Sequence, residues 1–417
     1  MIEILQAWNA IIYNTFLIPV IFFSILFYFF AITTILTGKV RMVYRKPKDA
    51  EWPSITVQIP VYNDPIAVRC IKKCLKFDYP KDRYHIIVAD DSTDSKTRNA
   101  LDRFVRGKKS VRLVRRKNRE GWKAGALNNI LPISRGEYIV MFDADFIAPR
   151  NFLKKIVSPF FTDDRIAIVQ SRMGYANSDY NSITKFASLS LMIFHHVIMP
   201  LNSKMKTVMF CGTHGAIKKS VLVEMGGWNT ISVTEDADLS LKMLLAGYRT
   251  IYLPNLRARG EVPWTLDSFL KQQTRWTYGQ TRAMADNVRN ILSSSNLIFR
   301  QRFMLLFSLL AYIVIPFIIV TAITGQLGWV INNPKPFELS DFLNFMFTFL
   351  LTFGYGTMGA VALAREGKIK KSPKIILLVF PLGIIMSVTN LIAFLKAILN
   401  RPLTWVKTPK FSGNLLD

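Results

Sequence analysis

An uncharged apolar run near the start of the chain limits its possible folds more than any other feature. Residues Ala10 to Leu36 carry no charged side chain and read AIIYNTFLIPVIFFSILFYFFAITTIL. A helix of this length crosses the hydrocarbon core of a bilayer. The run is too long for the core of a signal peptide, and no small-residue cleavage site follows it. The sequence therefore predicts a membrane protein with one transmembrane helix within residues 1–38.

The charges on the two sides of this run predict its orientation. Glu3 is the one charged side chain before it, whereas Lys and Arg residues cluster between Lys39 and Lys48. Basic flanks remain in the cytoplasm. We therefore expect the N-terminus outside the cell, the residues after Thr37 in the cytoplasm, and a multi-pass protein of the plasma membrane.

The chain is strongly basic, with a formal net charge of +26. Such a charge suits anionic lipid, nucleic acid or phosphorylated substrates. The sequence has no zinc-finger spacing, helix-turn-helix pattern or RNP-like aromatic pair, so we expect no nucleic-acid partner. Cys70 and Cys74 lie four residues apart in a helical pattern and are expected to be buried packing residues.

A regular alternation of short apolar runs and helical patterns extends from Trp52 to about Val262. The expected strands are rich in Val and Ile and lie within residues 54–60, 84–91, 111–117, 137–145 and 166–171. The expected helices between them lie within residues 64–77, 95–107, 124–131 and 150–161. This βαβα order predicts an α/β, Rossmann-like domain over residues 53–262, with a largely parallel, doubly wound sheet whose ligands bind beyond the carboxyl ends of the strands.

The composition changes after Pro263. Residues 263–302 mix aromatic and basic side chains at helical spacing, which predicts helices lying along a membrane surface. Residues 303–400 form the expected C-terminal membrane region, with spans from Phe303 to about Thr324 and from Phe342 to about Ala364. The apolar stretch Ile375 to Leu399 either crosses or lies in the interface, and we favour the interface because it keeps the basic tail, residues 401–417, in the cytoplasm.

Two acidic pairs follow expected strands. Asp143 and Asp145 end the sequence EYIVMFDAD, and carboxylates this close repel each other unless a cation lies between them. Mg²⁺ or Mn²⁺ bridging to a substrate diphosphate would suit them, although an exposed turn without a ligand explains the pair equally well. Asp90 and Asp91 in VADDSTD are placed to accept hydrogen bonds from a nucleoside, or else to begin a helix.

Three further segments carry groups able to do chemistry. Lys123 lies between two glycines, where a small-residue turn lets a phosphate approach, although a solvated lysine is the ordinary interpretation. Glu235 and Asp236 begin an amphipathic helix, either as favourable dipole charges or with Asp236 as a general base. Gln272, Arg275 and Trp276 share one helix face, which suits either a sugar site or an interface anchor.

Taken in order, these segments resemble a known enzyme family. VQIPVYND, VADDSTD, GWKAGALN, FDADF, FCGTHGAIKKSVLVEMGGW, VTEDADLSLKMLLAGY and QQTRW are similar to the motifs of the processive inverting glycosyltransferases of family 2, which include cellulose, hyaluronan and chitin synthases. The nearest resemblance is to the cellulose synthase-like mannan and glucomannan synthases, and it covers Pro53 to Gly279. The segment TWVKTPKFSG, Thr404 to Gly413, resembles the gating-loop motif of such enzymes.

The resemblance implies a GT-A fold for residues 53–262 and a role for each matching residue. The implied donor site holds the nucleoside and diphosphate with Tyr62, Asp90, Asp91, Lys123 and Asp143, and the implied Mg²⁺ or Mn²⁺ ligands are Asp143 and Asp145. The implied catalytic group is Asp236 as base, with Glu235 beside it and Arg275 at the leaving group. The implied acceptor site is formed by Cys211, Gly212, Thr213, Gln272 and Trp276. His214 stands where related sequences usually carry a smaller residue.

The implied activity is transfer of a sugar from a nucleotide sugar, such as UDP-glucose or GDP-mannose, to a growing β-linked polysaccharide. An alternative is a single transfer to a lipid, as in ceramide glucosyltransferase-like enzymes, which carry the same motifs. A third hypothesis is a non-enzymatic scaffold that binds the bilayer through its basic surface. Few spans are expected for a polysaccharide channel, so a homo-oligomer or an export subunit is a further expected partner.

Overall fold

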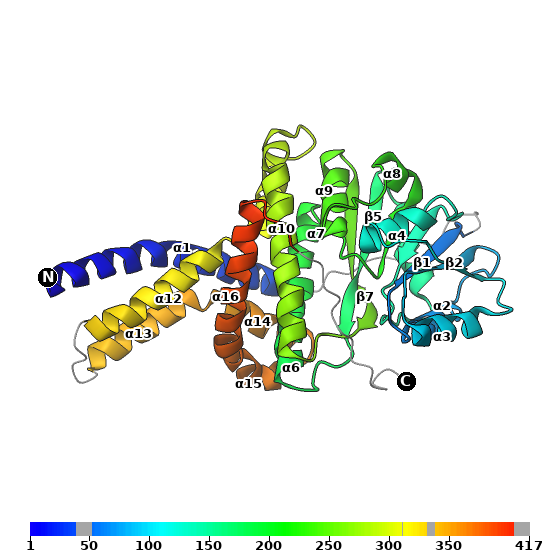
Figure 1. The fold of residues 1–417 in the computed structure, drawn as a ribbon. Helices are drawn as coiled ribbons and strands as arrows, with labels where there is room; N and C mark the ends of the chain where they lie inside the picture. Colours follow the sequence, from blue (N-terminus) through cyan, green and yellow to red (C-terminus); the bar gives the residue numbers. More distant parts are fainter. Residues whose placement is uncertain (39–51, 311, 332–337, 404–417) are drawn as a thin grey trace.

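The computed structural model describes residues 1–38, 52–310, 312–331 and 338–403 (Figure 1). It comprises an α/β domain and a set of long helices that extend from one side of it. The gating-loop-like motif at 404–413 and the basic cluster between Lys39 and Lys48 lie outside the described residues.

The α/β domain is built on one seven-stranded sheet with the order β3-β2-β1-β4-β6-β5-β7. Its strands are β1 Ile55–Val61, β2 Tyr84–Asp90, β3 Val111–Val114, β4 Tyr138–Met141, β5 Ile166–Tyr175, β6 Gly215–Lys218 and β7 Arg249–Gly260. Strands β3, β2, β1 and β4 are parallel, and β5 is parallel to β7, whereas β6 runs antiparallel to both of its neighbours. The expected α/β class and the largely parallel sheet are therefore confirmed.

Helices cover both faces of this sheet, because successive side chains along a strand point into two different apolar cores. In β4, Tyr138 and Val140 belong to one core, and Ile139 and Met141 belong to the other. The first core packs against α2 Ala67–Cys74, α3 Ser95–Val105 and α5 Phe152–Val157, with the 3₁₀ turn Ser158–Phe161 after it. The second packs against α4 Trp122–Ile130, α8 Lys219–Glu224 and α9 Glu235–Leu245.

Five strands were expected, and all five are present, but β6 and β7 were missed. β6 is only four residues long. β7 contains Pro254 and three arginines, so it does not read as an apolar run, and it is tolerated because it lies at the edge of the sheet. The end of β7 also pairs with the segment after the acidic motif, through a bridge between Ile147 and Arg259.

Two layers of helix join this domain to the apolar bundle. The first is a continuous apolar segment made of α6 Ser182–Ile193, the π-helix η2 Phe194–Ile198 and α7 Met199–Met205. The second is α10 Leu266–Ser293, which begins with a cap from Thr265 and is amphipathic. α10 packs beside α16 Val379–Ile398.

Four described helices are long and apolar enough to cross a membrane: Ile2–Leu36 (α1), Ser182–Met205, Val314–Ile331 (α12) and Pro381–Ile398 within α16. A fifth candidate is the pair α13 Leu339–Thr352 and α14 Gly354–Arg365, which is bent by 58°. The span expected from Phe303 to Thr324 is thus wrong in its bounds, because α11 Phe299–Leu310 ends before α12 begins at Val314, with Pro316 in the first turn, where a missing N–H is tolerated. The span expected from Phe342 to Ala364 is not one straight helix, and Ser182–Met205 was not expected at all.

α16 and α10 have a different direction from the apolar bundle. In Figure 1, α1, α12 and α13 extend together away from the sheet, whereas α10 and α16 lie side by side and crosswise to them. The short helix α15 Ser372–Leu377 and the 3₁₀ turn Ile369–Lys371 lead into α16. This arrangement suits a position of α16 along the membrane surface, which stays a prediction.

Polar contacts fix α1 against the C-terminal helices. The Asn9 side chain donates to the Thr324 carbonyl at 3.0 Å. The Gly354 N–H donates to Ser24 Oγ at 2.9 Å, and the backbones approach so closely that a Cβ on Gly354 would lie 2.1 Å from the Ser24 carbonyl oxygen. Arg365 donates to the Thr34 carbonyl at the other end of α1. Small residues and interhelical hydrogen bonds are the usual basis of helix packing in lipid.

Candidate active site

The first turn of α4 is the centre of the candidate site. Gly121 precedes it with φ +67°, a left-handed conformation that favours glycine. Lys123 then projects toward the neighbouring loops, where its Nζ donates to Asp143 Oδ1 and to the Gly212 carbonyl, both at 2.8 Å. Burial alone would lower the pKa of Lys123, but the charges of Asp143 and Glu235 outweigh it and raise that pKa. Lys123 is therefore a firmly charged link between two loops.

The two aspartates after β4 occupy different environments. Asp143 is partly exposed, and its N–H donates to Thr213 Oγ1 at 2.9 Å. Asp145, the second expected ligand of the cation, is 1% exposed, and its Oδ2 accepts the Glu261 N–H at 3.0 Å. Asp145 therefore holds Glu261, just after β7, against the turn that contains both aspartates, and Asp143 is the more solvent-exposed of the two carboxylates.

The loop Phe210–His214, which we name the 210–214 loop, lies opposite Lys123. A Cβ built on Gly212 (φ +71°) would be 2.8 Å from Asp236 Oδ2. Burial, followed by the charge of Asp236, raises the pKa of the Cys211 thiol, so this cysteine is not a thiolate. The three expected acceptor-side residues Cys211, Gly212 and Thr213 thus lie between Lys123 and Asp236.

Asp236 lies in the first turn of α9. Its Oδ1 accepts the Ala237 N–H at 2.9 Å, and its carbonyl accepts from Ser240 Oγ, which in turn accepts the Phe210 N–H. Burial, followed by the charge of Glu235, raises the pKa of Asp236 to about 7. The charges of Lys123 and Arg275 act in the opposite direction. A carboxylate with a pKa near neutrality suits a general base.

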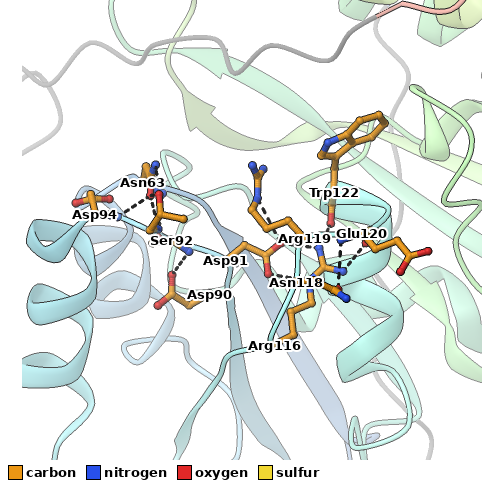
Figure 2. Close-up of polar contacts among 11 residues, drawn as sticks. Asn63, Asp90, Asp91, Ser92, Asp94, Arg116, Asn118, Arg119, Glu120 and Trp122 are labelled. Atoms are coloured by element: carbon orange, nitrogen blue, oxygen red, sulfur yellow. Dashed lines mark hydrogen bonds and ion pairs between the residues drawn. The ribbon is translucent and has the colours of Figure 1, made fainter.

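Asp90, the last residue of β2, and Asp91, which follows it, also differ in accessibility, with side chains 0% and 7% exposed. Asp90 is buried, and its two oxygens accept from the Ser92 N–H and from Arg115 Nε. Asp91 is held by Arg116 through two parallel bonds of 2.8 and 2.7 Å (Figure 2). Arg116 also donates to the carbonyls of Glu120 and Trp122 just ahead of Lys123.

Tyr62 lies beside this cluster. The guanidinium carbon of Arg119 is 3.3 Å from the centroid of the Tyr62 ring, and Arg119 Nε is 4.0 Å from Asp91 Oδ2. A flat cationic group over an aromatic ring provides a stacking surface for another flat group.

α10 closes the side of the site next to Asp236. Gln272, Arg275 and Trp276 are partly buried on this helix, and the charge of Arg275 acts on Asp236. α10 approaches the start of α9 closely at Gly279, where a Cβ would lie 2.2 Å from Thr234 Cγ2. Thr234 occupies the N-cap position of α9 but makes no side-chain capping bond, so N-capping does not explain why a threonine is found there.

A continuous series of contacts therefore joins the three acidic segments and Lys123. It runs from Asp91 through Arg116 to the start of α4, and from Lys123 to Asp143 and to the 210–214 loop beneath Asp236. Sequence reasoning missed Arg116 and Gln170, although the basic end of the expected strand VRLVRRK was a signal for a cation near Asp91. Within the described residues, no group of three or more His, Cys, Asp or Glu side chains is placed to hold a metal ion.

Chemically, the arrangement provides a cation and a carboxylate at one end, a carboxylate of raised pKa at the other, and a loop between them. A negatively charged leaving group would be stabilised at the Lys123 end, and a proton would be accepted at the Asp236 end.

Comparison with protein families agrees with this layout. A family model described as "Glycosyl transferase family group 2" matches residues 138–355. Glucomannan 4-beta-mannosyltransferase 7 of Arabidopsis thaliana is 30% identical over 268 residues, which are 62% of this chain and 48% of that protein. The cellulose synthase catalytic subunit [UDP-forming] of Pseudomonas fluorescens (strain SBW25) is 31% identical over 268 residues, which are 61% of this chain and 36% of that protein. The chain spans about half the length, or less, of these curated relatives.

A solved structure has a similar fold over nearly the whole chain. The mannosyltransferase PcManGT from Pyrobaculum calidifontis, in complex with GDP-Man and Mn²⁺, superposes with a TM-score of 0.64 at 19% identity, covering 96% of this chain and 100% of that one. At this identity the likeness shows the fold, and it confirms the expected GT-A type.

Proposed function

The chain belongs to glycosyl transferase family group 2, and from this membership we propose that it is a membrane-bound inverting glycosyltransferase. Its donor is a nucleotide sugar such as GDP-mannose or UDP-glucose, and its product is a β-linked polysaccharide. The names of the relatives support this choice, since they include glucomannan mannosyltransferases and a UDP-forming cellulose synthase subunit.

The observation that carries the proposal is the position of Asp236 relative to Lys123. Lys123 Nζ donates to the Gly212 carbonyl at 2.8 Å, and Asp236 Oδ2 lies so close to the Cα of the same glycine that an added Cβ would be 2.8 Å from it. In the proposed reaction the acceptor hydroxyl gives its proton to Asp236, and its oxygen bonds to the anomeric carbon of the donor. The bond from that carbon to the diphosphate oxygen breaks at the same time, and Lys123 and Arg275 stabilise the departing nucleoside diphosphate. Displacement at an α-linked donor gives a β-glycoside.

The donor groups fit a divalent cation at Asp143. Its carboxylate is partly exposed, and Mg²⁺ or Mn²⁺ is usually held by one or two carboxylates together with substrate phosphates. Such an ion would neutralise charge on the diphosphate. Because Asp145 is buried, we assign it to holding the turn that presents Asp143.

The nucleoside is assigned to the cluster around Asp91. Asp91 would accept from the base, Tyr62 and Arg119 would provide the stacking surface, and Arg116 would fix the carboxylate. Asp90 supports the turn from within. On the acceptor side, Trp276 and Gln272 of α10 would contact the sugar next to the 210–214 loop.

A donor screen tests the proposal. The purified full chain is supplied with GDP-mannose or UDP-glucose and with Mn²⁺ or Mg²⁺, and release of nucleoside diphosphate is measured. Radiolabelled product is then sized, because a polymer and a single glycolipid differ in length. A protein that binds no nucleotide in the presence of either metal, and releases none, would contradict the proposal.

A further inference from the structure

Gln170 lies behind the 210–214 loop, and its side chain is hydrogen-bonded to it. It is fully buried in β5. Its Oε1 accepts the Cys211 N–H at 2.9 Å, and its Nε2 lies 3.1 Å from the Thr213 carbonyl and 2.8 Å from His214 Nδ1. One amide therefore contacts three residues of the loop.

The contact with Cys211 also settles the orientation of this amide. A backbone N–H can only donate, so the atom facing Cys211 is the oxygen, and the atom facing His214 is the nitrogen. The nitrogen donates, so His214 Nδ1 is an acceptor and the imidazole is neutral. Burial is the main cause that lowers the pKa of His214 to about 4, which agrees with a neutral ring.

The loop has a backbone that needs such support. Gly212 and His214 both have positive φ, at +71° and +42°. A residue with a side chain seldom adopts this conformation, and it persists only where its surroundings hold it. His214 is held by Gln170, by hydrogen bonds between Ser171 and its carbonyl, and by Phe146, whose ring centroid is 4.9 Å from that of the imidazole.

The position of the loop determines the positions of the proposed reacting groups. Its Gly212 carbonyl binds Lys123, its Thr213 hydroxyl binds the backbone of Asp143, and its Phe210 N–H is linked through Ser240 to Asp236. A shift of this loop would therefore move the cation and the base relative to each other.

We propose that Gln170 is a positioning residue for sugar transfer, acting with His214 to hold the 210–214 loop between the leaving-group side and the base. The inference rests on the proposed function for its kinetic consequence, whereas its structural consequence holds independently. Misplacing reacting groups by about 1 Å can cost roughly a hundredfold in rate. Loss of the Gln170 amide is therefore expected to lower kcat far more than it weakens nucleotide binding.

The sheet offers a matched control. Gln58 in β1 is also fully buried, and its Nε2 donates to Ser134 Oγ at 2.9 Å, away from the loop. Gln58→Met and Gln170→Met each remove one buried amide and keep the side-chain length. A purely structural effect of losing an amide would appear in both variants.

The first experiment measures hydrogen exchange by mass spectrometry on the full chain in detergent. We expect faster exchange over residues 208–216 in Gln170→Met and no change there in Gln58→Met. Unchanged protection of this segment in Gln170→Met would overturn the proposal, whether or not the chain has the proposed activity.

The second experiment measures kcat with GDP-mannose or UDP-glucose, together with GDP and UDP affinity by calorimetry. We expect Gln170→Met and His214→Leu to lower kcat by about a hundredfold with nucleotide affinity retained. His214→Asn should recover much of the loss, since the Asn Oδ1 can take the place of Nδ1. Equal losses in Gln58→Met and Gln170→Met, or no difference between the Leu and Asn variants, would refute a positioning role. An inactive wild type would instead contradict the proposed function, leaving the exchange result to decide on Gln170.

Discussion

The Asp236 carboxylate lies over Gly212 so closely that a Cβ on this glycine would be 2.8 Å from Oδ2. This contact places the candidate base next to the loop whose carbonyl binds Lys123 on its other side. The first prediction follows from it.

Gly212→Ala is expected to reduce transfer severely because the added methyl group displaces Asp236. Gly226→Ala is the control, since Gly226 has φ +81° but nothing within 4 Å of an added Cβ. Both substitutions place a side chain in the left-handed region, at about 1–2 kcal/mol each. The unfolding temperature should therefore fall in both variants, whereas kcat should fall in Gly212→Ala alone. Equal losses of kcat in the two variants would show that backbone strain, not contact with Asp236, is responsible.

Asp236→Asn is expected to lower kcat by about 10²–10⁴-fold, because the amide cannot accept the acceptor proton. Affinity for GDP or UDP should be retained, and calorimetry checks this. Asp238→Asn on the same helix is the control, as Asp238 pairs with Lys242 at 3.0 Å and not with the site. An active Asp236→Asn enzyme would remove Asp236 from the role of base.

The pKa of Asp236 predicts the pH dependence. Because burial and Glu235 raise it to about 7, kcat/KM should rise with pH and reach half its maximum near pH 7. Glu235→Gln should move this midpoint to lower pH, since it removes a neighbouring negative charge. The stability of the fold depends on pH in the opposite direction, because a raised carboxyl pKa means that the folded protein binds the proton of Asp236 more tightly than the unfolded chain does. The resulting contribution to the free energy of unfolding is complete below pH 3.8 and is lost as pH rises through 7. A pH–rate profile that does not shift in Glu235→Gln would contradict the assignment.

Arg116→Lys is expected to weaken nucleotide binding by about tenfold, because lysine keeps the charge but loses the two parallel bonds to Asp91. Calorimetry with GDP and UDP measures the loss. Arg103→Lys, on the exposed side of α3, is the matched control and should bind normally. Normal binding in Arg116→Lys would mean that Asp91 needs no such clamp.

Glu366 is the basis of a prediction about stability. It accepts from Arg172, His196 and Arg257 at the end of α14 and is thus tied to β5, η2 and β7. Burial alone would raise its pKa, but the His196 hydrogen bond and the Arg172 charge outweigh burial and lower it to about 2. Its contribution to stability is therefore present above pH 4.5 and is lost as pH falls through 2.

Glu366→Gln should cost about 3–5 kcal/mol of unfolding free energy at neutral pH, because Arg172, whose side chain is 15% exposed, loses its carboxylate partner. Asp286→Asn, at an exposed pair with Arg282, should cost well under 1 kcal/mol. Thermal unfolding in detergent compares the two variants. Equal losses would show that the Glu366 cluster contributes no more than a surface pair.

The α/β class could be predicted because apolar runs and helical patterns alternate from residue 53 onward. The strand-end rule also located Asp91 and Asp143, since β2 and β4 are parallel to β1 and their carboxyl ends share one edge. The rule could not tell which of two neighbouring carboxylates turns inward. Asp90 and Asp145 are buried by partners from distant segments, Arg115 and the Glu261 backbone.

The membrane region was harder to predict from hydropathy alone. A window of apolar residues does not reveal the bend between α13 and α14, or the close packing of Gly354 at that bend against Ser24. Nor does it separate a lipid-facing helix from Ser182–Met205, which is apolar because it lies between the sheet domain and the bundle. Gln170 was missed for a similar reason: its role comes from a loop forty residues later in the chain.

The contacts of Asn9, Ser24 and Thr34 give α1 a fixed rotational setting as well as a fixed depth. Inserting one residue between Asn9 and Ser24 would rotate one half of the helix by roughly 100° against the other and advance it by about 1.5 Å. At most one of the two flanking contacts would then keep its partner. The length and rotation of the N-terminal helix are therefore both fixed by its contacts, and an apolar helix of another length would not replace it.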